Sequence, residues 1–324
     1  MVDRCLRAAL AASALLAVAA VIPFNAVAAP DYPSRAITLI VPYPPGGGVD
    51  VMARLVGQRL SAALGRQVVI ENRGGAGGMI GTRDLAKAAP DGYTLGMMLT
   101  GISLGAHTGY DVNKDFSPIG LIASTPILVV ANPALAAKSL ADVIALAKQQ
   151  PGKLSAGTPA APTINYFAAR LFNLTAGVNI TVVTYKGTAP LTNDVLGNHV
   201  PLGFDTIPAA VSNVAAGQLR AIAVTGPVRS AALPNVPTAA ESGLPGFEAL
   251  QYYGLTAPAG VPRPTVERLN DELRRILADE DFKKRLIAEG SDPAPSTPEQ
   301  YAANIKREEA KWAALVKKLG LNLE

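Results

Sequence analysis

The chain has 324 residues, more than one ordinary hydrophobic core holds, so two domains are expected. Hydrophobic residues make up 49% of the chain and charged residues 17%, which excludes a disordered, self-repelling polymer. The formal net charge is only +4, and no run of Lys and Arg is interleaved with aromatic residues, so nucleic acid is not an expected partner.

The N-terminal residues have the pattern of an export signal. Arg4 and Arg7 precede an apolar run over residues 8–21, and small residues follow up to Ala28. The run is shorter than the roughly 20 apolar residues of a membrane-spanning helix, and no later segment reaches that length. We therefore expect residues 1–28 to be cleaved off near Ala28 and the mature protein to be soluble in the periplasm.

Cysteine and histidine are too scarce to support metal or thiol chemistry. The only cysteine, Cys5, lies before the apolar run, so it cannot carry a lipid and leaves with the signal. The two histidines, His107 and His199, are isolated in the sequence. We expect no metal site, no cofactor and no thiol catalysis.

The first part of the mature chain alternates apolar strands with helical periodicity. Strands are predicted at residues 37–41, 67–71 and 93–99. Between the first two lies a predicted helix, which we expect Asp50 to cap and Gly65 to end.

A second series of the same kind begins with a strand at residues 127–130. A helix follows from Ser139, whose spacing to Asp142 is that of a capping box. The remaining elements of this series are predicted at residues 163–174, 180–185, 189–196, 200–205 and 219–224. A connecting region then surrounds one strand at residues 252–257, and helices are predicted at residues 265–277 and 298–319, the last with a capping box at Thr297 and Gln300.

This alternation predicts an α/β protein with two lobes, each a mixed, mostly parallel sheet flanked by helices. The chain builds one lobe, leaves for the other and returns, through connecting segments near residues 119–125 and 225–254. Two such crossovers form a hinge. We place lobe 1 at residues 29–122 and 228–324, and lobe 2 at residues 123–227.

The glycine-rich turn over residues 41–50 is the most informative motif. A strand ends there in Pro-Pro-Gly-Gly-Gly and a helix opens, so backbone N–H groups and the positive helix end can bind an anion. The turn lacks the lysine of a nucleotide P-loop and the G-x-G-x-x-G spacing, which argues against nucleotide phosphate. A tight strand-to-helix turn without a ligand remains the alternative.

A second glycine cluster covers residues 72–81. Its spacing resembles a dinucleotide fingerprint, but it does not follow the first strand, and no acidic residue ends a strand about 20 residues later. Close backbone packing between the lobes is the expected use.

Residues 101–105 match the G-x-S-x-G pattern of a serine hydrolase, with Ser103 as the nucleophile. That motif requires a helix directly after the serine, and Gly105, Thr108 and Gly109 would break one. A periplasmic hydrolase using Ser103 is kept as an alternative function.

Several motifs in chain order resemble the tripartite tricarboxylate transporter receptor family, the Bug or TctC-type solute-binding proteins. The resemblance covers nearly the whole mature chain. It rests on residues 37–50, 64–73, 75–81, 90–95, 185–187, 189–190, 203–205 and 233–238.

The resemblance implies a periplasmic binding protein of the Venus flytrap type, whose two lobes close on a small carboxylate and deliver it to the membrane permease of a tripartite tricarboxylate transporter. It implies a monomer without enzymatic activity. Few charged side chains are assigned to the pocket, so a mono- or dicarboxylate is expected over a tricarboxylate. An orphan receptor used for signalling is the other alternative.

Carried over residue by residue, the resemblance also implies a ligand site, with Asp205 closing its far side. The family's usual glycines are replaced by Ala160 and Pro162, and a usual histidine and glutamate by Tyr166 and Arg170, while residues 100–110 form a shorter segment than usual. The implied site consists of Tyr43, Pro44, Gly46, Gly47, Thr100, Ser103, Gly157, Thr158, Thr163, Lys186, Gly187 and Asp205.

Overall fold

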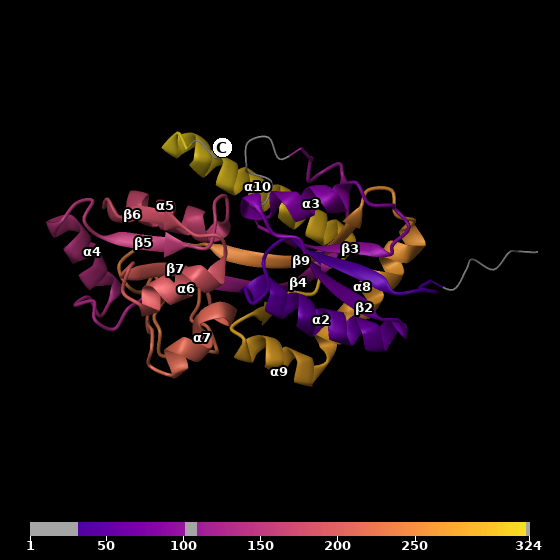
Figure 1. Ribbon diagram of the computed structural model, residues 1–324, viewed down its shortest axis with the longest axis horizontal. Helices are drawn as coiled ribbons and strands as arrows, with labels where there is room; N and C mark the ends of the chain where they lie inside the picture. Colours follow the sequence, from indigo (N-terminus) through magenta and orange to yellow (C-terminus); the bar gives the residue numbers. More distant parts are fainter. Residues whose placement is uncertain (1–31, 101–108, 322–324) are drawn as a thin grey trace, which may run out of the picture. The chain divides into compact units, whose positions relative to one another are not determined.

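The computed structural model describes residues 32–100 and 109–321. The whole predicted signal, Ser103 and His107 lie outside these residues. The chain divides into two units, Met1–Ser34 and Arg35–Glu324, and the fold described below is that of the second (Figure 1).

The first strands form the parallel part of one sheet. β1 pairs with β2 on one side and with β3 on the other, and all three strands run in the same direction. Each βαβ connection carries a helix, as the alternating pattern predicted. The elements are β1 (Ile37–Val41), α2 (Gly48–Leu64), β2 (Val68–Asn72), a 3-10 turn η1 (Ala76–Gly78), α3 (Met79–Ala86) and β3 (Thr94–Leu99).

Two long antiparallel strands continue this sheet. β9 (Leu250–Pro258) pairs with β3, and β4 (Phe116–Ala131) pairs with β9 over most of its length. Residues 119–125, predicted as a connecting segment, lie within strand β4, which passes from the first sheet to the second. The strand contains Pro118 and Pro126, and its pairing with β9 shifts register at Pro118/Gly120 and at Leu121/Ala123.

β4 then enters a second sheet. Its last residues pair antiparallel with β7 and β8, while β5 pairs in parallel with β6 and β7. Both sheets therefore mix parallel and antiparallel strands, which confirms the predicted α/β architecture. The elements are α4 (Leu140–Gln149), β5 (Ser155–Thr158), α5 (Ile164–Ala176), β6 (Thr181–Thr184), α6 (Thr188–Leu196), β7 (Leu202–Thr206), α7 (Ile207–Ala215) and β8 (Arg220–Val224).

The second sheet is buried on both faces, as the period of two along β4 shows. Ile127, Val129 and Ala131 face a cluster that includes Phe167 and Phe204, whereas Leu128 and Val130 face the opposite cluster, with Leu191 and Val195. Helices must cover both faces to bury these side chains.

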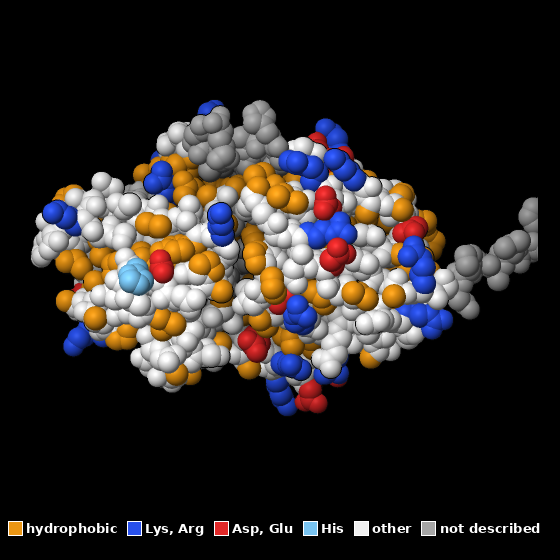
Figure 2. All heavy atoms as spheres, in the orientation of Figure 1, with side chains coloured by type: hydrophobic (Ala, Val, Ile, Leu, Met, Phe, Trp, Pro, Cys, Tyr) orange, Lys and Arg blue, Asp and Glu red, His pale blue; other side chains and the backbone are white. Residues whose placement is uncertain are grey.

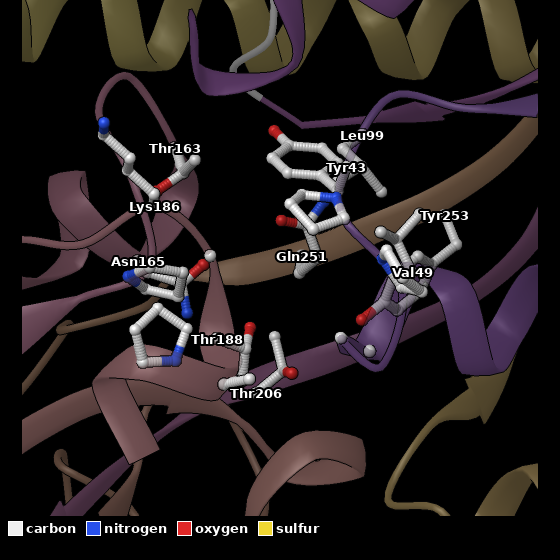
Figure 3. Close-up of a pocket in the computed structure, with 18 residues that line it drawn as sticks. Tyr43, Val49, Leu99, Thr163, Asn165, Lys186, Thr188, Thr206, Gln251 and Tyr253 are labelled. Atoms are coloured by element: carbon white, nitrogen blue, oxygen red, sulfur yellow. The ribbon is translucent and has the colours of Figure 1, made fainter. Parts of the chain in front are cut away.

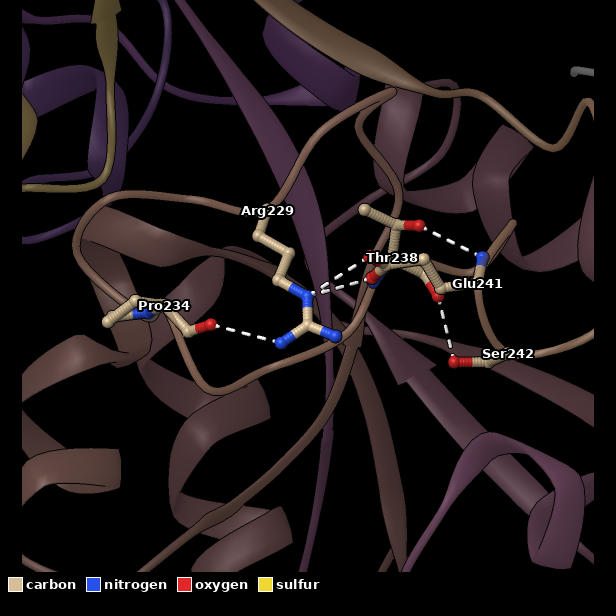
Figure 4. A network of polar contacts seen from close by, with 5 residues as sticks. All are labelled: Arg229, Pro234, Thr238, Glu241 and Ser242. Carbon is tan, nitrogen blue, oxygen red and sulfur yellow. Dashed lines mark hydrogen bonds and ion pairs between the residues drawn. The ribbon is translucent and has the colours of Figure 1, made fainter.

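The described connection from β8 to β9 contains no helix or strand of its own, and hydrogen bonds and an ion pair of its side chains hold it in place. Arg229 forms an ion pair with Glu241 at 2.9 Å and donates a hydrogen bond to the Pro234 carbonyl (Figure 4). Thr238 and Glu241 bond reciprocally: the Thr238 N–H donates to the Glu241 carboxylate, and the Glu241 N–H donates to the Thr238 hydroxyl. This crossover therefore has a defined path.

The C-terminal helix contacts both sheets' cores. Its Tyr301 packs directly over Gly254 in β9, and its Trp312 stacks on Phe167 with ring centroids 5.9 Å apart. The predicted capping box at Thr297 and Gln300 is confirmed. The last elements are α8 (Arg263–Ala278), α9 (Glu280–Ala288), a short β10 (Asp292–Pro293) that pairs with β4, and α10 (Pro298–Leu319).

The residues at the ends of α2 and α4 can be compared with the predicted capping residues. Ser139 and Asp142 form the predicted capping box of α4, and Gly65 ends α2 with φ at +65°. The expected capping role of Asp50 was wrong, because the N-cap of α2 is Gly47. Asp50 lies within the first turn and accepts a hydrogen bond from the Gly46 N–H.

Within residues 32–100 and 109–321, no helix is long and apolar enough to cross a bilayer. The same residues contain no cluster of His, Cys, Asp and Glu that could bind a metal ion.

Candidate functional site

A cavity of about 70 Å³ lies where residues of the two sheets face each other (Figure 3). One wall comes from the turn after β1, the start of α2, β3 and β9, and the other from the starts of α5, α6 and α7. Its lining includes Tyr43, Pro44, Gly47, Gly48, Val49, Leu99, Thr163, Asn165, Lys186, Gly187, Thr188, Thr206, Gln251 and Tyr253.

Four helices begin at this cavity. The N-cap residues of α2, α5, α6 and α7 are Gly47, Thr163, Gly187 and Thr206, and all four line it. The first N–H groups of a helix have no partner within the helix, and its N-terminus carries a partial positive charge. Four such ends around one small cavity create a site that favours an anion.

Three of these helix starts lack a side-chain cap. Gly47 and Gly187 have no side chain to offer, and the Thr206 hydroxyl makes no capping hydrogen bond. Only Thr163 caps its own helix, by accepting a bond from the Tyr166 N–H at 3.4 Å. The first turns of α2, α6 and α7 therefore have N–H groups that can donate hydrogen bonds to a ligand.

Two buried hydroxyls also face this region. Thr206 Oγ1 and Tyr253 Oη have no hydrogen-bond partner among the described residues. Both lie beside Gly48, where an added Cβ would be 2.7 Å from the first oxygen and 3.1 Å from the second. Burial raises the pKa of Tyr253 far above its usual value, so the phenol stays protonated. Buried hydroxyls without partners are costly, which makes them suited to a polar ligand.

The side-chain charge of the described cavity lining is positive. Lys186 is the only charged side chain among the described residues that line it, and it is exposed at the margin. On the molecular face drawn in Figure 2, positive and negative side chains are otherwise interspersed. An anion in this cavity would meet no carboxylate of the described lining.

The cavity brings together half of the residues implied by the sequence. Gly46 and Thr100 do not line it: Gly46 donates its N–H to Asp50, and the Thr100 hydroxyl accepts a bond from the Tyr252 N–H. Ser103 lies outside the described residues. Those that line the cavity are Tyr43, Pro44, Gly47, Thr163, Lys186 and Gly187, and the others outside the lining are Gly157, Thr158 and Asp205.

Asp205 lies behind the cavity wall at the start of α7. Its carboxylate accepts hydrogen bonds from the Thr206 N–H at 2.8 Å and from the Thr192 hydroxyl at 3.4 Å. The side chain is almost fully buried, and this burial raises the pKa of Asp205 to about 7.

Sequence reasoning missed several lining residues. Thr206 directly follows the predicted strand and is followed by Pro208, a first-turn signal for a helix that was not recognised. Gln251 and Tyr253 alternate along β9, so both point to the same face of the strand. Asn165 lies in the first turn of a predicted helix and Thr188 directly before another, and only the fold shows that the two helix starts meet at one cavity.

The second glycine cluster packs between the two walls, as expected. A Cβ on Gly77 would lie 2.7 Å from the Ala161 carbonyl oxygen. Tyr43 donates its hydroxyl to the Gly77 carbonyl at 2.8 Å, which ties the first glycine turn to the second cluster.

The sequence profile described as the tripartite tricarboxylate transporter family receptor matches residues 52–321. The chain belongs to this family. The resemblance inferred from the motifs is thereby confirmed. Members of the family are substrate-binding receptors and not enzymes, which rules out the hydrolase alternative with Ser103.

Sequence and structure relatives cover nearly the whole chain. Protein BugT of Bordetella pertussis is 36% identical over 304 residues, which are 92% of this chain and 93% of BugT. The structure of Rpa4515 of R. palustris with adipate has a TM-score of 0.87 and 35% identity, covering 89% of this chain and 98% of its own. MatC of Rhodopseudomonas palustris with bound malate has a TM-score of 0.82 and 31% identity, covering 88% and 100%.

These similarities confirm the two-lobe, α/β fold of a periplasmic binding protein. Receptors of this family are periplasmic. The individual ligand-binding residues and the lobe boundaries at residues 122/123 and 227/228 stay predictions.

Proposed function

We propose that this receptor binds a small mono- or dicarboxylate in the cavity between the two sheets and delivers it to the permease of a tripartite tricarboxylate transporter. The observation that carries the proposal is the convergence of four helix N-termini on one cavity whose described lining contains no carboxylate.

The energetics suit a carboxylate. Each helix N-terminus contributes about 0.3–1 kcal/mol to a nearby anion, and hydrogen bonds to an ionised acceptor are roughly twice as strong as neutral ones. The open first turns of α2, α6 and α7 supply such donors, and the hydroxyls of Thr206 and Tyr253 add to them. Lys186 at the margin balances one further charge. A tricarboxylate would need more cations than this lining provides.

The ligands of the solved relatives support the same class. Adipate in Rpa4515 and malate in MatC are both dicarboxylates. Both structures align with almost the whole of the described chain.

We propose that Tyr43, Pro44, Gly47, Thr163 and Gly187 contact the ligand directly. The other residues of the implied site would act behind these contacts: Gly46, Gly157, Thr158 and Asp205 by supporting the walls, and Thr100 by fixing β9 through its bond to Tyr252. Binding is proposed to close lobe 1 (residues 29–122 and 228–324) on lobe 2 (residues 123–227), without a cofactor.

We further propose that residues 1–28 direct export, that cleavage occurs near Ala28, and that the mature receptor is a monomer in the periplasm. N-terminal sequencing of exported protein tests the cleavage, and a retained Arg4 would contradict it. Sedimentation of the mature protein tests the monomer.

The central experiment is a thermal-shift and calorimetry screen of the mature protein against aliphatic, hydroxylated, amino and aromatic carboxylates. A ligand at 100 times its dissociation constant should add about 2.7 kcal/mol to the free energy of unfolding. If no carboxylate shifts the melting temperature, the proposal is wrong. Uptake of the identified ligand by cells with and without the receptor then separates transport from signalling.

A further inference from the structure

Building on the proposed function, we infer that the ligand carries a hydroxyl group beside its carboxylate, so that this receptor selects hydroxycarboxylates over their deoxy counterparts. The inference rests on two side-chain amides, those of Asn165 and Gln251, which offer acceptor oxygens to the cavity. The rest of the lining is rich in donors, and these two amides are the exception.

Asn165 is fixed in its orientation. Its side chain is 5% exposed, and its Nδ2 donates to the Phe204 carbonyl at 3.1 Å. A backbone carbonyl can only accept, so the NH2 group must point there and the Oδ1 atom must point the other way. No described residue donates a hydrogen bond to Oδ1.

Gln251 repeats the arrangement from the opposite wall. Its side chain is 3% exposed, and its Nε2 donates to the Tyr252 carbonyl at 2.9 Å. The Oε1 atom receives no hydrogen bond from the described residues. Figure 3 shows Asn165 and Gln251 among the side chains that surround the cavity.

A carboxylate cannot satisfy these two oxygens, because an ionised carboxylate only accepts hydrogen bonds. Its entry would expel water and leave both acceptors without donors, at a cost for each. The hydroxyls of Thr206 and Tyr253 can donate as well as accept, but neither forms a hydrogen bond with the amide oxygen of Asn165 or Gln251. A ligand that brings a donor of its own satisfies these oxygens.

A neutral hydroxyl fits better than an ammonium group. A buried ammonium needs a facing carboxylate, and none lines the described cavity. The Asp205 carboxyl lies behind the wall and already accepts bonds from Thr206 and Thr192. A hydroxyl donates to an amide oxygen without adding charge, and it can accept from Thr206 or Tyr253 in turn.

The test compares matched pairs of ligands by competition calorimetry: malate against succinate, lactate against propionate, and mandelate against phenylacetate. In each pair that binds, the hydroxylated member should bind about tenfold to a hundredfold more tightly, because a buried acceptor left without a donor costs about 1–3 kcal/mol. Aspartate serves as the ammonium analogue of malate and should bind more weakly than malate.

The variant Gln251→Met keeps the length of the side chain and removes the acceptor. It should weaken binding of the hydroxylated member and reduce the ratio within its pair by about tenfold. The matched control is Gln149→Met, at an exposed position at the end of α4 that does not line the cavity. It should leave the ratio unchanged.

The outcomes separate the inference from the function on which it rests. Deoxy members that bind as tightly as their hydroxylated partners would overturn the inference and leave the carboxylate receptor intact, as would a ratio unaffected by Gln251→Met. Tighter binding of aspartate than of malate would also overturn the inference, because it would show that the site prefers an ammonium group to a hydroxyl. Failure of every carboxylate to bind would overturn the proposed function itself.

Discussion

Several of the described helix starts fall into two groups, which differ in whether a side chain accepts hydrogen bonds from their first backbone N–H groups. α4 and α10 begin with full capping boxes, in which Ser139 and Asp142, or Thr297 and Gln300, satisfy one another's backbone groups. α2, α6 and α7 begin at the cavity without any side-chain cap. The first group needs nothing further, whereas the second leaves its N–H groups for a ligand.

This contrast shows how a sequence separates stability from binding. A capping residue at a helix start contributes about 1 kcal/mol to the folded state. Where Gly47 and Gly187 occupy the same position, no side chain accepts a hydrogen bond from the first N–H groups, and the positive end of the helix stays accessible. The predictions below therefore expect changes at closed caps to alter stability and changes at open caps to alter affinity.

The largest effect is expected at Gly48, the first residue of α2. A Cβ there would lie 2.7 Å from Thr206 Oγ1 and 3.1 Å from Tyr253 Oη, so Gly48→Val should fill the site and lower affinity at least about a hundredfold. Calorimetry with the identified ligand measures the loss. Ala141→Val, in the first turn of the closed helix α4, is the control and should bind normally. A folded Gly48→Val protein with unchanged affinity would place the site elsewhere.

The second effect is on the pH dependence of stability, and it compares Asp205, beside the open start of α7, with Asp142, in the capping box of α4. Burial raises the pKa of Asp205 to about 7, above its value in the unfolded chain, so its contribution to stability is lost as pH rises toward 7. The empty wild type should lose about 2 kcal/mol of unfolding free energy from about pH 5.5 to about pH 8, and Asp205→Asn should not show this loss. Urea denaturation at both pH values measures it.

The carboxyl of the closed cap should behave in the opposite way. Backbone N–H groups of Lys138 and Ser139 hold the pKa of Asp142 below its usual value, so its contribution is present at neutral pH and disappears on acidification. An Asp142→Asn variant that flattened the loss near neutral pH, instead of Asp205→Asn, would reverse the assignment.

A matched pair of hydroxyl deletions is expected to show effects of about 1 kcal/mol in opposite assays. Thr206→Val removes an oxygen that has no partner in the described protein, so it should lower affinity about tenfold and leave stability nearly unchanged. Ser139→Ala removes a cap and should lower the unfolding free energy by about 1 kcal/mol without changing affinity. If both variants changed the same quantity, the distinction between open and closed caps would fail.

The smallest effect is expected at Lys186. Because this side chain is exposed at the margin, Lys186→Met should weaken binding only about threefold, and the difference should shrink at high salt. Calorimetry at low and high ionic strength tests it. A loss as large as that of Gly48→Val would mean that the cation, and not the helix starts, dominates the site.

Local signals in the sequence were sufficient for much of the fold. The capping boxes of α4 and α10 and the stop of α2 at Gly65 depend only on neighbouring residues, and all were predicted correctly. β4 was predicted only over residues 127–130, because its full length, including Pro118 and Pro126, depends on pairing with β9 and β7 that no local pattern shows.

The site was harder to predict for the same reason. The turn containing Gly47 was found because its strand, glycines and helix are adjacent in sequence. Tyr253 and Gln251 are separated from it by about two hundred residues, and which side of β9 faces the cavity depends on the sheet that surrounds the strand. Residues that meet only through tertiary structure leave no local pattern.

The C-terminal helix gives this receptor a mechanical property. α10 has 22 residues, about 33 Å of helix, and it is held at Tyr301 against Gly254 and at Trp312 against Phe167. A rotation of one sheet away from the other therefore has to bend this helix or pull the indole from its stacked partner. In the proposed opening of the empty receptor, α10 opposes the motion, and the free energy of that opening is subtracted from the free energy of binding. With this proposed opening, the affinity depends on a helix that does not line the cavity.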